Sequence, residues 1–223
     1  MKRLASPKFW KIGRRNKKFV ITPRPGPHKK EKSIPLGIII RDYLKCAETL
    51  EEAKKVMNKI RVNGKIRKDY RFPVGLMDII EAANLYYRIV PSKNYLELKE
   101  VNDGNIKLSK IVNKTYLKGN RVQINLHDGG NFVVKKEEDK FKTGDVIAFD
   151  LLNKEKKVLK FDKGSVVLIT EGSNVGRIGR VEEIKITKST KPNIVVLSVE
   201  NKKIEVPKDY CFVIGEKEPL IEV

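Results

Sequence analysis

The stretch Lys163–Ile184, KGSVVLITEGSNVGRIGRVEEI, decides how the C-terminal part of the chain folds. It contains two short apolar runs typical of strands, joined by the glycine-rich connection TEGSNVGRIG. Gly172, Gly176 and Gly179 permit positive φ, so we expect a tight loop whose backbone can approach a ligand closely. Arg177 and Arg180 would extend from this loop as its charged contacts.

A glycine-rich loop could instead hold the phosphates of a nucleotide. The spacing of Gly172, Gly176 and Gly179 does not match Gly-x-Gly-x-x-Gly, and no Gly-Lys-Ser/Thr follows. Phosphate loops of that kind also precede a helix, whereas the residues from Val181 onward have a β-like pattern. We therefore do not expect the loop to belong to a nucleotide-dependent enzyme; its backbone is suited to approach a chain of phosphates.

The chain is strongly basic. Its 223 residues carry a formal net charge of +20 and a pI near 9.8. Such a surplus indicates a polyanionic partner, nucleic acid first and an acidic membrane second. No apolar run reaches the roughly 18 residues of a membrane span, and the basic N-terminus shows no secretory signal. We therefore expect a cytosolic protein.

More than half of the surplus charge lies in residues 1–32, which hold 12 lysines and arginines and one acid. Prolines at positions 7, 23, 25 and 27 disfavour a long helix or a central strand. We predict an extended basic arm that becomes ordered on its partner; the alternative is a solvated tail without function. Adjacent Phe9 and Trp10 favour the first, with Trp10 either stacking on a base or packing against the next module.

Residues 33–98 have the clearest helical patterns. IPLGIIIRDYLK (34–45) has apolar residues near helical spacing, and TLEEAKKVMNKI (49–60) opens with a capping box made by Thr49 and Glu52. Asn63-Gly64 predicts a type I′ turn between short strands, and YRFPVGLMDII and LYYRIV predict further strands. This order indicates an α+β module.

Basic residues follow the polar sides of these elements. They are Arg41 and Lys45 on the first helix, Lys54, Lys55 and Lys59 on the second, and Lys65, Arg67 and Lys68 after the hairpin turn. We expect packing to merge them into one basic face. For any single residue, the alternative is an ordinary solvated surface.

The remaining residues have β patterns. Residues 99–160 contain the strand-like stretches RVQINL, TGDVIAFDL and KKVLKF, with a DGGN turn after the first of them. This pattern predicts a small barrel or sandwich. In 161–223, NIVVLSVE and KKIEVP join the strands around the glycine loop, which predicts a small SH3-like barrel. His127-Asp128 at the DGGN turn is typical of turn chemistry, and no serine or cysteine nucleophile is evident beside it.

Metal and thiol chemistry are not indicated. The two cysteines, Cys46 and Cys211, and the two histidines, His28 and His127, match no familiar zinc spacing. We predict no metal, no cofactor and two reduced, largely buried thiols.

Two segments resemble known RNA-binding modules. The helices with RDYLK and EEAKKVM, the hairpin IRVNGKI and the stretch PVGLMDII resemble the alpha-L RNA-binding fold, although Thr49-Leu50 stands where that fold usually has Ser-Arg. The stretch around Gly176-Arg177-x-Gly179-Arg180 resembles the KOW motif of ribosomal proteins and transcription elongation factors.

Taken in order, the parts resemble the archaeal and eukaryotic small-subunit ribosomal protein family called S-four-e, over nearly the whole chain. The parts are a basic N-terminal arm (1–35), an alpha-L module (36–98), a central β domain (99–160) and a C-terminal KOW barrel (161–223), an α+β multidomain fold. The short chain and compact C-terminus are more typical of archaeal members.

The resemblance implies a non-catalytic constituent of the cytoplasmic ribosome. Its partners would be small-subunit ribosomal RNA and neighbouring ribosomal proteins, with no membrane and no small-molecule substrate. The expected RNA contacts are Lys8, Trp10, Arg14, Arg15, Lys17, Lys18, Arg24, Lys29, Lys30, Arg41, Lys45, Lys54, Lys55, Lys65, Arg67, Lys68, Arg177 and Arg180.

Two other functions are consistent with single parts of the chain. Alpha-L modules accompany RNA-modification enzymes, but such an enzyme needs a positioned acid, base or nucleophile, and the acids here are scattered among lysines. A KOW-type transcription factor would leave the basic arm and the alpha-L module unexplained.

Overall fold

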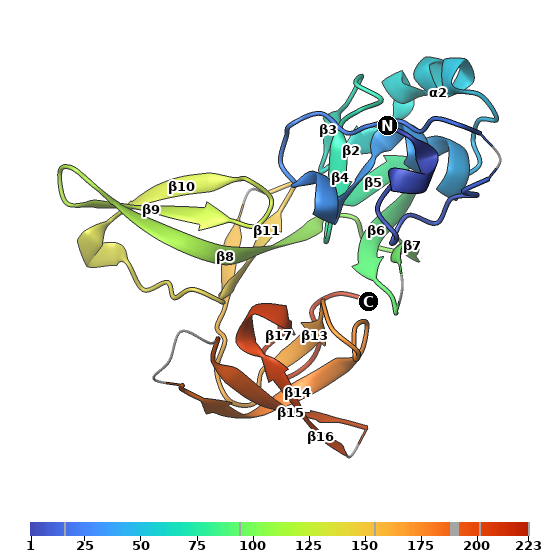
Figure 1. Ribbon diagram of the computed structural model, residues 1–223. Coiled ribbons are helices and arrows are strands. Elements are labelled where there is room, and N and C mark those ends of the chain that lie inside the picture. The colour runs from blue at the N-terminus through green and yellow to red at the C-terminus, as the bar shows by residue number, and fades with distance from the viewer. Residues whose placement is uncertain (16, 94, 154, 188–191, 201, 223) are drawn as a thin grey trace. The chain divides into compact units, whose positions relative to one another are not determined.

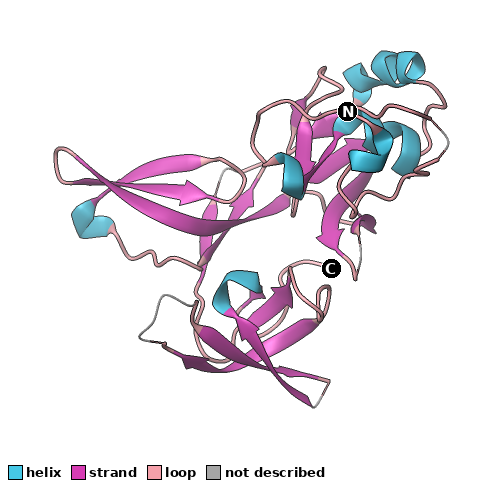
Figure 2. Cartoon of the chain, in the orientation of Figure 1, coloured by secondary structure: helices cyan, strands magenta, loops and turns pink. Residues whose placement is uncertain are grey.

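A computed structural model describes the chain except at residues 16, 94, 154, 188–191, 201 and 223 (Figure 1). The chain divides into two compact units, Met1–Lys107 and Leu108–Val223. Short helices and many antiparallel strands form these units (Figure 2), so the mixed α and β content predicted from the sequence is present, with strands dominant. Across the described ranges, the helices are all too short or too polar to cross a membrane.

The first unit combines short helices with an antiparallel sheet of strand order β3-β2-β5-β6-β7. The helices are η1 (Arg3–Ala5), η2 (Lys30–Lys32), α1 (Leu36–Ile38), η3 (Ile39–Tyr43), α2 (Leu50–Val56) and η4 (Met57–Lys59). The sheet strands are β2 (Arg61–Val62), β3 (Lys65–Ile66), β5 (Ile79–Ala82), β6 (Leu85–Pro91) and β7 (Leu96–Val101), while β1 (Ser33–Pro35) pairs with β4 (Pro73–Gly75). The module boundary expected at residue 98 falls inside β7, which pairs with β6 along its whole length.

The helix signals have structural counterparts. Pro35 immediately precedes α1, which continues as the π-helix η3 and ends at Tyr43, a shorter helix than expected. The Thr49 hydroxyl accepts the N–H of Glu52 at 3.3 Å, and the Glu52 carboxylate accepts the N–H of Glu48 at 3.0 Å. These bonds satisfy backbone donors at the start of α2, as the capping pattern predicts.

The turn between β2 and β3 is the expected type I′. Asn63 and Gly64 have φ of +52° and +73°, the combination this turn requires. The Asn63 side chain also accepts the N–H of Ile79 at 3.0 Å and donates to Asp78 at 2.8 Å. The hairpin is thereby fastened to the start of β5.

The N-terminal segment, residues 1–32, is packed onto the first unit. Trp10 is 1% exposed and its indole N–H donates to the Ser33 carbonyl at 2.9 Å. Val20 is buried in the same apolar core, and the N–H of Arg24 donates to the Arg71 carbonyl at 2.9 Å. The prediction that this segment needs a partner to become ordered is therefore wrong, because its few apolar side chains fix it to its own unit. Of the two roles considered for Trp10, packing is the one observed.

A buried carboxylate joins several parts of the first unit. Asp78 is 2% exposed and accepts the N–H of Gly75 at 2.9 Å and the amide of Asn63 at 2.8 Å. Its oxygens also lie 2.8 Å from His28 Nε2 and 3.3 Å from Lys107 Nζ. Burial alone would raise the pKa of Asp78, but the hydrogen bond and charge of His28, followed by the charge of Lys107, outweigh it and hold the pKa well below its usual range.

The second unit contains, in its described residues, two five-stranded antiparallel sheets. One has the order β10-β9-β8-β11-β12 and the other β16-β15-β14-β13-β17. The first consists of β8 (Ile106–Leu117), β9 (Arg121–Leu126), β10 (Asn131–Lys135), β11 (Val146–Asp150) and β12 (Lys156–Leu159), with η5 (Lys136–Glu138) between β10 and β11. The second consists of β13 (Val166–Ile169), β14 (Ile178–Lys185), β15 (Ile194–Val199), β16 (Lys202–Pro207) and β17 (Cys211–Gly215), with η6 (Lys208–Tyr210) before β17.

The sheet β10-β9-β8-β11-β12 has its own apolar cluster around Ile111, Ile124 and Ile147. Phe132 and Phe141 pack edge to face beside it, with ring centroids 5.6 Å apart. The expected strands are present, and in the described residues they form one sheet.

Replacing Asp78 by asparagine should destabilise the first unit. The change leaves His28 and Lys107 beside a neutral group, and removing one partner of a buried charge pair costs about 3–5 kcal/mol. Because the folded-state pKa lies below the unfolded value near 4, the Asp78 contribution is present above about pH 5 and is lost as pH falls. Urea denaturation should therefore show a larger deficit at pH 7 than at pH 3, where only part of the contribution has been lost because the folded-state carboxylate is still ionised. The exposed Glu31→Gln is the control and should change stability little; equal stability of D78N and wild type at pH 7 would contradict the assignment.

Candidate nucleic-acid interface

Most of the predicted basic contacts in the N-terminal segment face solvent. The exposed ones are Lys8, Arg15, Lys17, Lys18, Arg24, Lys29 and Lys30. Arg14 is only partly exposed, and its guanidinium donates to the carbonyls of Ser6 at 3.2 Å and Pro7 at 2.9 Å. Since Trp10 is buried, the segment presents charge on its outside while its apolar residues hold it to the unit.

Arg41 and Lys45 do not share a helix face as predicted. Arg41 is partly buried and forms a two-point pair with Asp42, at 3.2 and 2.7 Å. Helix η3 ends at Tyr43, and Lys45 lies beyond it in the left-handed region with φ of +54°. The helical spacing argument fails here because the helix stops first; Lys45 remains exposed.

The basic side chains of α2 and of the β2–β3 hairpin reach the surface. Lys54 and Lys55 are exposed, and Lys54 Nζ lies 3.0 Å from Glu51 and 5.3 Å from the centroid of the Tyr70 ring. Lys65 and Lys68 are exposed as well. Arg67 is partly buried and stacks on Phe72, with its guanidinium carbon 4.5 Å from the ring centroid.

Part of this basic set is brought together where the N-terminal segment runs beside residues 69–71. Arg24 pairs with Asp69 at 3.4 Å, and Arg71 Nε donates to the Thr22 carbonyl at 3.0 Å. Lys54 covers Tyr70 from α2. The segment, α2 and this loop are therefore in contact, and their exposed lysines and arginines, with Asp69 and Glu51 among them, are called the basic region of the first unit below.

The glycine loop between β13 and β14 has the tight form that its sequence predicts. The N–H of Gly176 donates to the Ile169 carbonyl at 2.8 Å, and the N–H of Ile169 donates to the Arg177 carbonyl at 3.0 Å. Gly172 and Gly176 have φ of +94° and +83°, as expected of glycines in such a loop. Gly179 is required for a different reason, because a Cβ there would lie 2.6 Å from a Val199 methyl carbon.

Both arginines of the loop are exposed, as the sequence predicts. Arg177 follows Gly176 at the end of the loop, and Arg180 lies on β14, where its guanidinium donates to the Lys217 carbonyl at 2.9 Å. Both belong to the second unit.

The described residues show how far the metal and catalytic patterns considered from the sequence are present. In the described part of the chain, no cluster of histidine, cysteine or acidic residues could hold a metal. The Ser109 hydroxyl, which the sequence did not single out, donates to Asp128 at 3.0 Å, and His127 Nδ1 accepts the N–H of Lys110 at 3.1 Å. These bonds join the turn after β9 to β8.

The two thiols differ, contrary to the prediction that both are buried. Cys211 is buried in β17, and this burial raises its pKa to about 11. Cys46 is exposed because it follows the end of η3.

Three residues that lie where the N-terminal segment meets residues 69–71 were not predicted from the sequence as candidate site residues. Arg71 has no helical or hairpin pattern to mark it, and Phe19 and Tyr70 look like ordinary apolar residues. Only the course of the N-terminal segment beside residues 69–71 places them together.

Comparison with protein-family models gives two matches. The family described as "Ribosomal family S4e" matches residues 83–156, and the RS4NT domain matches residues 1–31.

Full-length relatives and a solved structure agree with these matches. The small ribosomal subunit protein eS4 of Archaeoglobus fulgidus is 42% identical over 100% of this chain and 97% of its own length. That of Methanocaldococcus jannaschii is 40% identical over 100% of this chain and 96% of its own. The crystal structure of the 30S ribosomal protein S4e from Thermoplasma acidophilum superimposes with a TM-score of 0.72 at 30% identity, covering 83% of this chain and 96% of that one.

Gly179→Ala should destabilise the glycine-loop sheet by about 1–3 kcal/mol, because the added methyl group overpacks against Val199. Val199→Ala, itself destabilising, should recover part of this loss in the double variant, so the two effects are coupled. The matched control is Gly172→Ala, where a Cβ meets Tyr210 at an ordinary 3.6 Å and the cost comes from its positive φ; its effect should add to that of Val199→Ala. Urea denaturation of the single and double variants checks this, and additivity in the Gly179 pair would contradict the packing argument.

Proposed function

Since the chain belongs to the ribosomal protein family S4e, we propose that it is a structural constituent of the small ribosomal subunit in the cytoplasm. The observation that carries the proposal is full-length similarity to archaeal eS4 proteins, together with a net charge of +20 displayed largely on exposed side chains. Small-subunit ribosomal RNA and neighbouring ribosomal proteins would be its partners.

The exposed lysines and arginines are suited to contact RNA phosphates. Neutralising phosphates releases condensed counterions, so affinity should fall steeply with salt. Folded RNA offers shape, phosphates and 2′-hydroxyl groups more readily than paired base edges. The basic region of the first unit would dock by such contacts, with Lys17, Lys29 and Lys30 reaching the backbone.

We interpret the first unit as an alpha-L module and the last sheet as a KOW barrel. The α2 helix and the β2–β3 hairpin support the first interpretation, and the glycine loop with Arg177 and Arg180 supports the second. A KOW-type transcription factor or an accessory of an RNA-modification enzyme is not favoured, because the similarity extends over 97% of the Archaeoglobus fulgidus eS4 protein. The role is binding and assembly, without catalysis.

Sucrose-gradient sedimentation of an extract from the source cell tests the function. The protein should migrate with the small subunit and remain there after a moderate salt wash. Recovery mainly as free protein, or together with RNA polymerase, would contradict the proposal.

Neutralising exposed lysines of the N-terminal segment should flatten the salt dependence of RNA binding. The variant Lys8→Gln, Lys17→Gln, Lys29→Gln and Lys30→Gln should reduce the slope of log affinity against log salt by about 0.7–1 for each phosphate that the protein no longer neutralises. Substitution is preferable to deletion, because removing residues 1–32 also removes Trp10 and Val20 from the core.

The matched control removes the same charge elsewhere, with Lys118, Lys157, Lys163 and Lys202 changed to glutamine; all four are exposed. Filter binding to small-subunit ribosomal RNA at several salt concentrations gives both slopes. Equal slopes for the two variants would show that the segment has no special contact with phosphate.

A further inference from the structure

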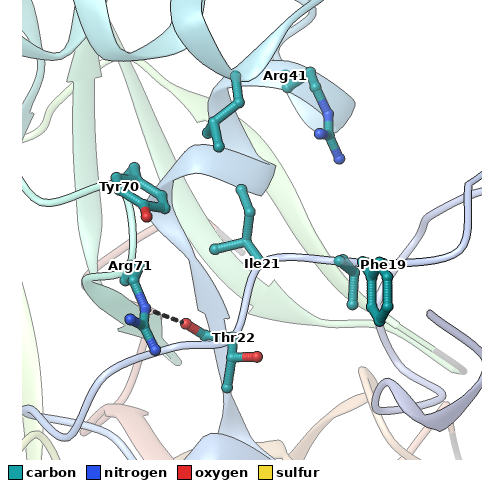
Figure 3. A pocket seen from close by; sticks show the side chains of 8 residues that line it. Phe19, Ile21, Thr22, Arg41, Tyr70 and Arg71 are labelled. Carbon is teal, nitrogen blue, oxygen red and sulfur yellow. Dashed lines mark hydrogen bonds between the residues drawn. The ribbon is translucent and has the colours of Figure 1, made fainter. Parts of the chain in front are cut away.

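The N-terminal segment and the body of the first unit line an open pocket of about 340 Å³. Phe19, Val20, Ile21 and Thr22 form one wall, and Arg41, Leu50, Tyr70 and Arg71 complete it. In Figure 3, Ile21 lies between Tyr70 and Arg71 on one side and Phe19 on the other, with Arg41 above. Residues from four separate parts of the sequence thus meet at one hollow.

The pocket has an apolar wall with an aromatic ring left in solvent at its edge. Val20 is buried and Ile21, Leu50 and Tyr70 are partly buried, whereas Phe19 is 63% exposed. An exposed phenylalanine contributes little to folding, and its ring offers a face on which a flat ligand can stack. Lys18 Nζ lies 5.6 Å from the centroid of this ring, which adds a cation beside the aromatic surface.

Two arginines line the pocket, and since Arg41 is already paired with Asp42, Arg71 supplies its available positive charge. The described residues that line it include Arg41 and Arg71 and no acid. The Arg71 side chain is fixed through its Nε, which donates to the Thr22 carbonyl at 3.0 Å. Its two terminal nitrogens have no hydrogen-bond acceptor among the described residues, so both can donate to the oxygens of an anion.

The wall from Phe19 to Thr22 is held in place without a ligand. Phe19 pairs with Lys2 in an antiparallel bridge, and the N–H of Val20 donates to the Met1 carbonyl at 3.0 Å. A pocket formed in advance spares its ligand the ordering cost of a mobile segment.

We propose that this pocket holds one unstacked nucleotide of the ribosomal RNA, with the base against Phe19 and the phosphate on Arg71. The inference rests on the proposed function and adds a defined nucleotide site to it. A base within a helix is stacked on its neighbours and cannot enter so small a hollow, whereas an unpaired base can stack on an aromatic side chain. The combination of an exposed ring, an apolar wall and an arginine fork suits the two ends of a nucleotide.

The test uses the full-length protein and small-subunit ribosomal RNA, with Phe19→Ala, Phe19→Tyr and the control Tyr95→Ala, another exposed aromatic residue of the same unit. Removing the base stacking by alanine substitution should weaken binding by about 5- to 150-fold. Phe19→Tyr keeps the ring and should bind like wild type, as should Tyr95→Ala. Thermal melts of all variants should coincide, because Phe19 is mostly exposed.

Chemical probing of the RNA locates the base. One unpaired nucleotide should be protected by the wild-type protein and by Phe19→Tyr, and become reactive with Phe19→Ala while the other protections persist. Unchanged affinity and protection with Phe19→Ala, or equal loss with Phe19→Tyr, would overturn the nucleotide site and leave the ribosomal function intact. Failure of the wild-type protein to bind the RNA at all would overturn both.

Discussion

The buried carboxylate of Asp78 is the constraint on which the first unit depends. A charge with 2% exposure is tolerated only when nearly every oxygen lone pair is satisfied, and here the N–H of Gly75, the amide of Asn63, the ring of His28 and the ammonium of Lys107 do so. His28 comes from the N-terminal segment, Asn63 from the hairpin and Lys107 from the end of the unit. The pair between His28 and Asp78 therefore fastens a chain segment that has little secondary structure of its own.

The consequence for function is a basic surface that exists before RNA arrives. A segment with 12 lysines and arginines would repel itself and remain extended if it had no anchors. Trp10, Val20 and His28 supply the anchors on its inner side, and most of the charged side chains, although not Arg3, are left outside. Binding then orders side chains and not a whole segment, which lowers its entropic cost. The glycine loop of the second unit also has a defined shape before binding, in its case through positive φ at Gly172 and Gly176.

The sequence predicted the elements with strong local signals and missed those set by long-range packing. Thr49 and Glu52, Asn63-Gly64 and the strands around the glycine loop have local patterns, and all are present in the structure. The order of the N-terminal segment was missed because its apolar residues are sparse and their partners lie far along the chain. The residues of the candidate site fall into the same two groups, those with a local signal and those placed by long-range contacts. The exposed lysines could be named from composition, but the pocket of Phe19, Tyr70 and Arg71 depends on a contact between residues about 50 positions apart.

Amide hydrogen exchange of the RNA-free protein tests most directly whether the N-terminal segment is folded in advance. The amides of Arg3, Val20 and Arg24 donate to backbone carbonyls in the structure, so their exchange should be slowed many-fold relative to the unfolded chain and should accelerate when Asp78 is replaced. Exchange of these three amides at the unfolded rate, in a protein whose sheets are protected, would contradict the account.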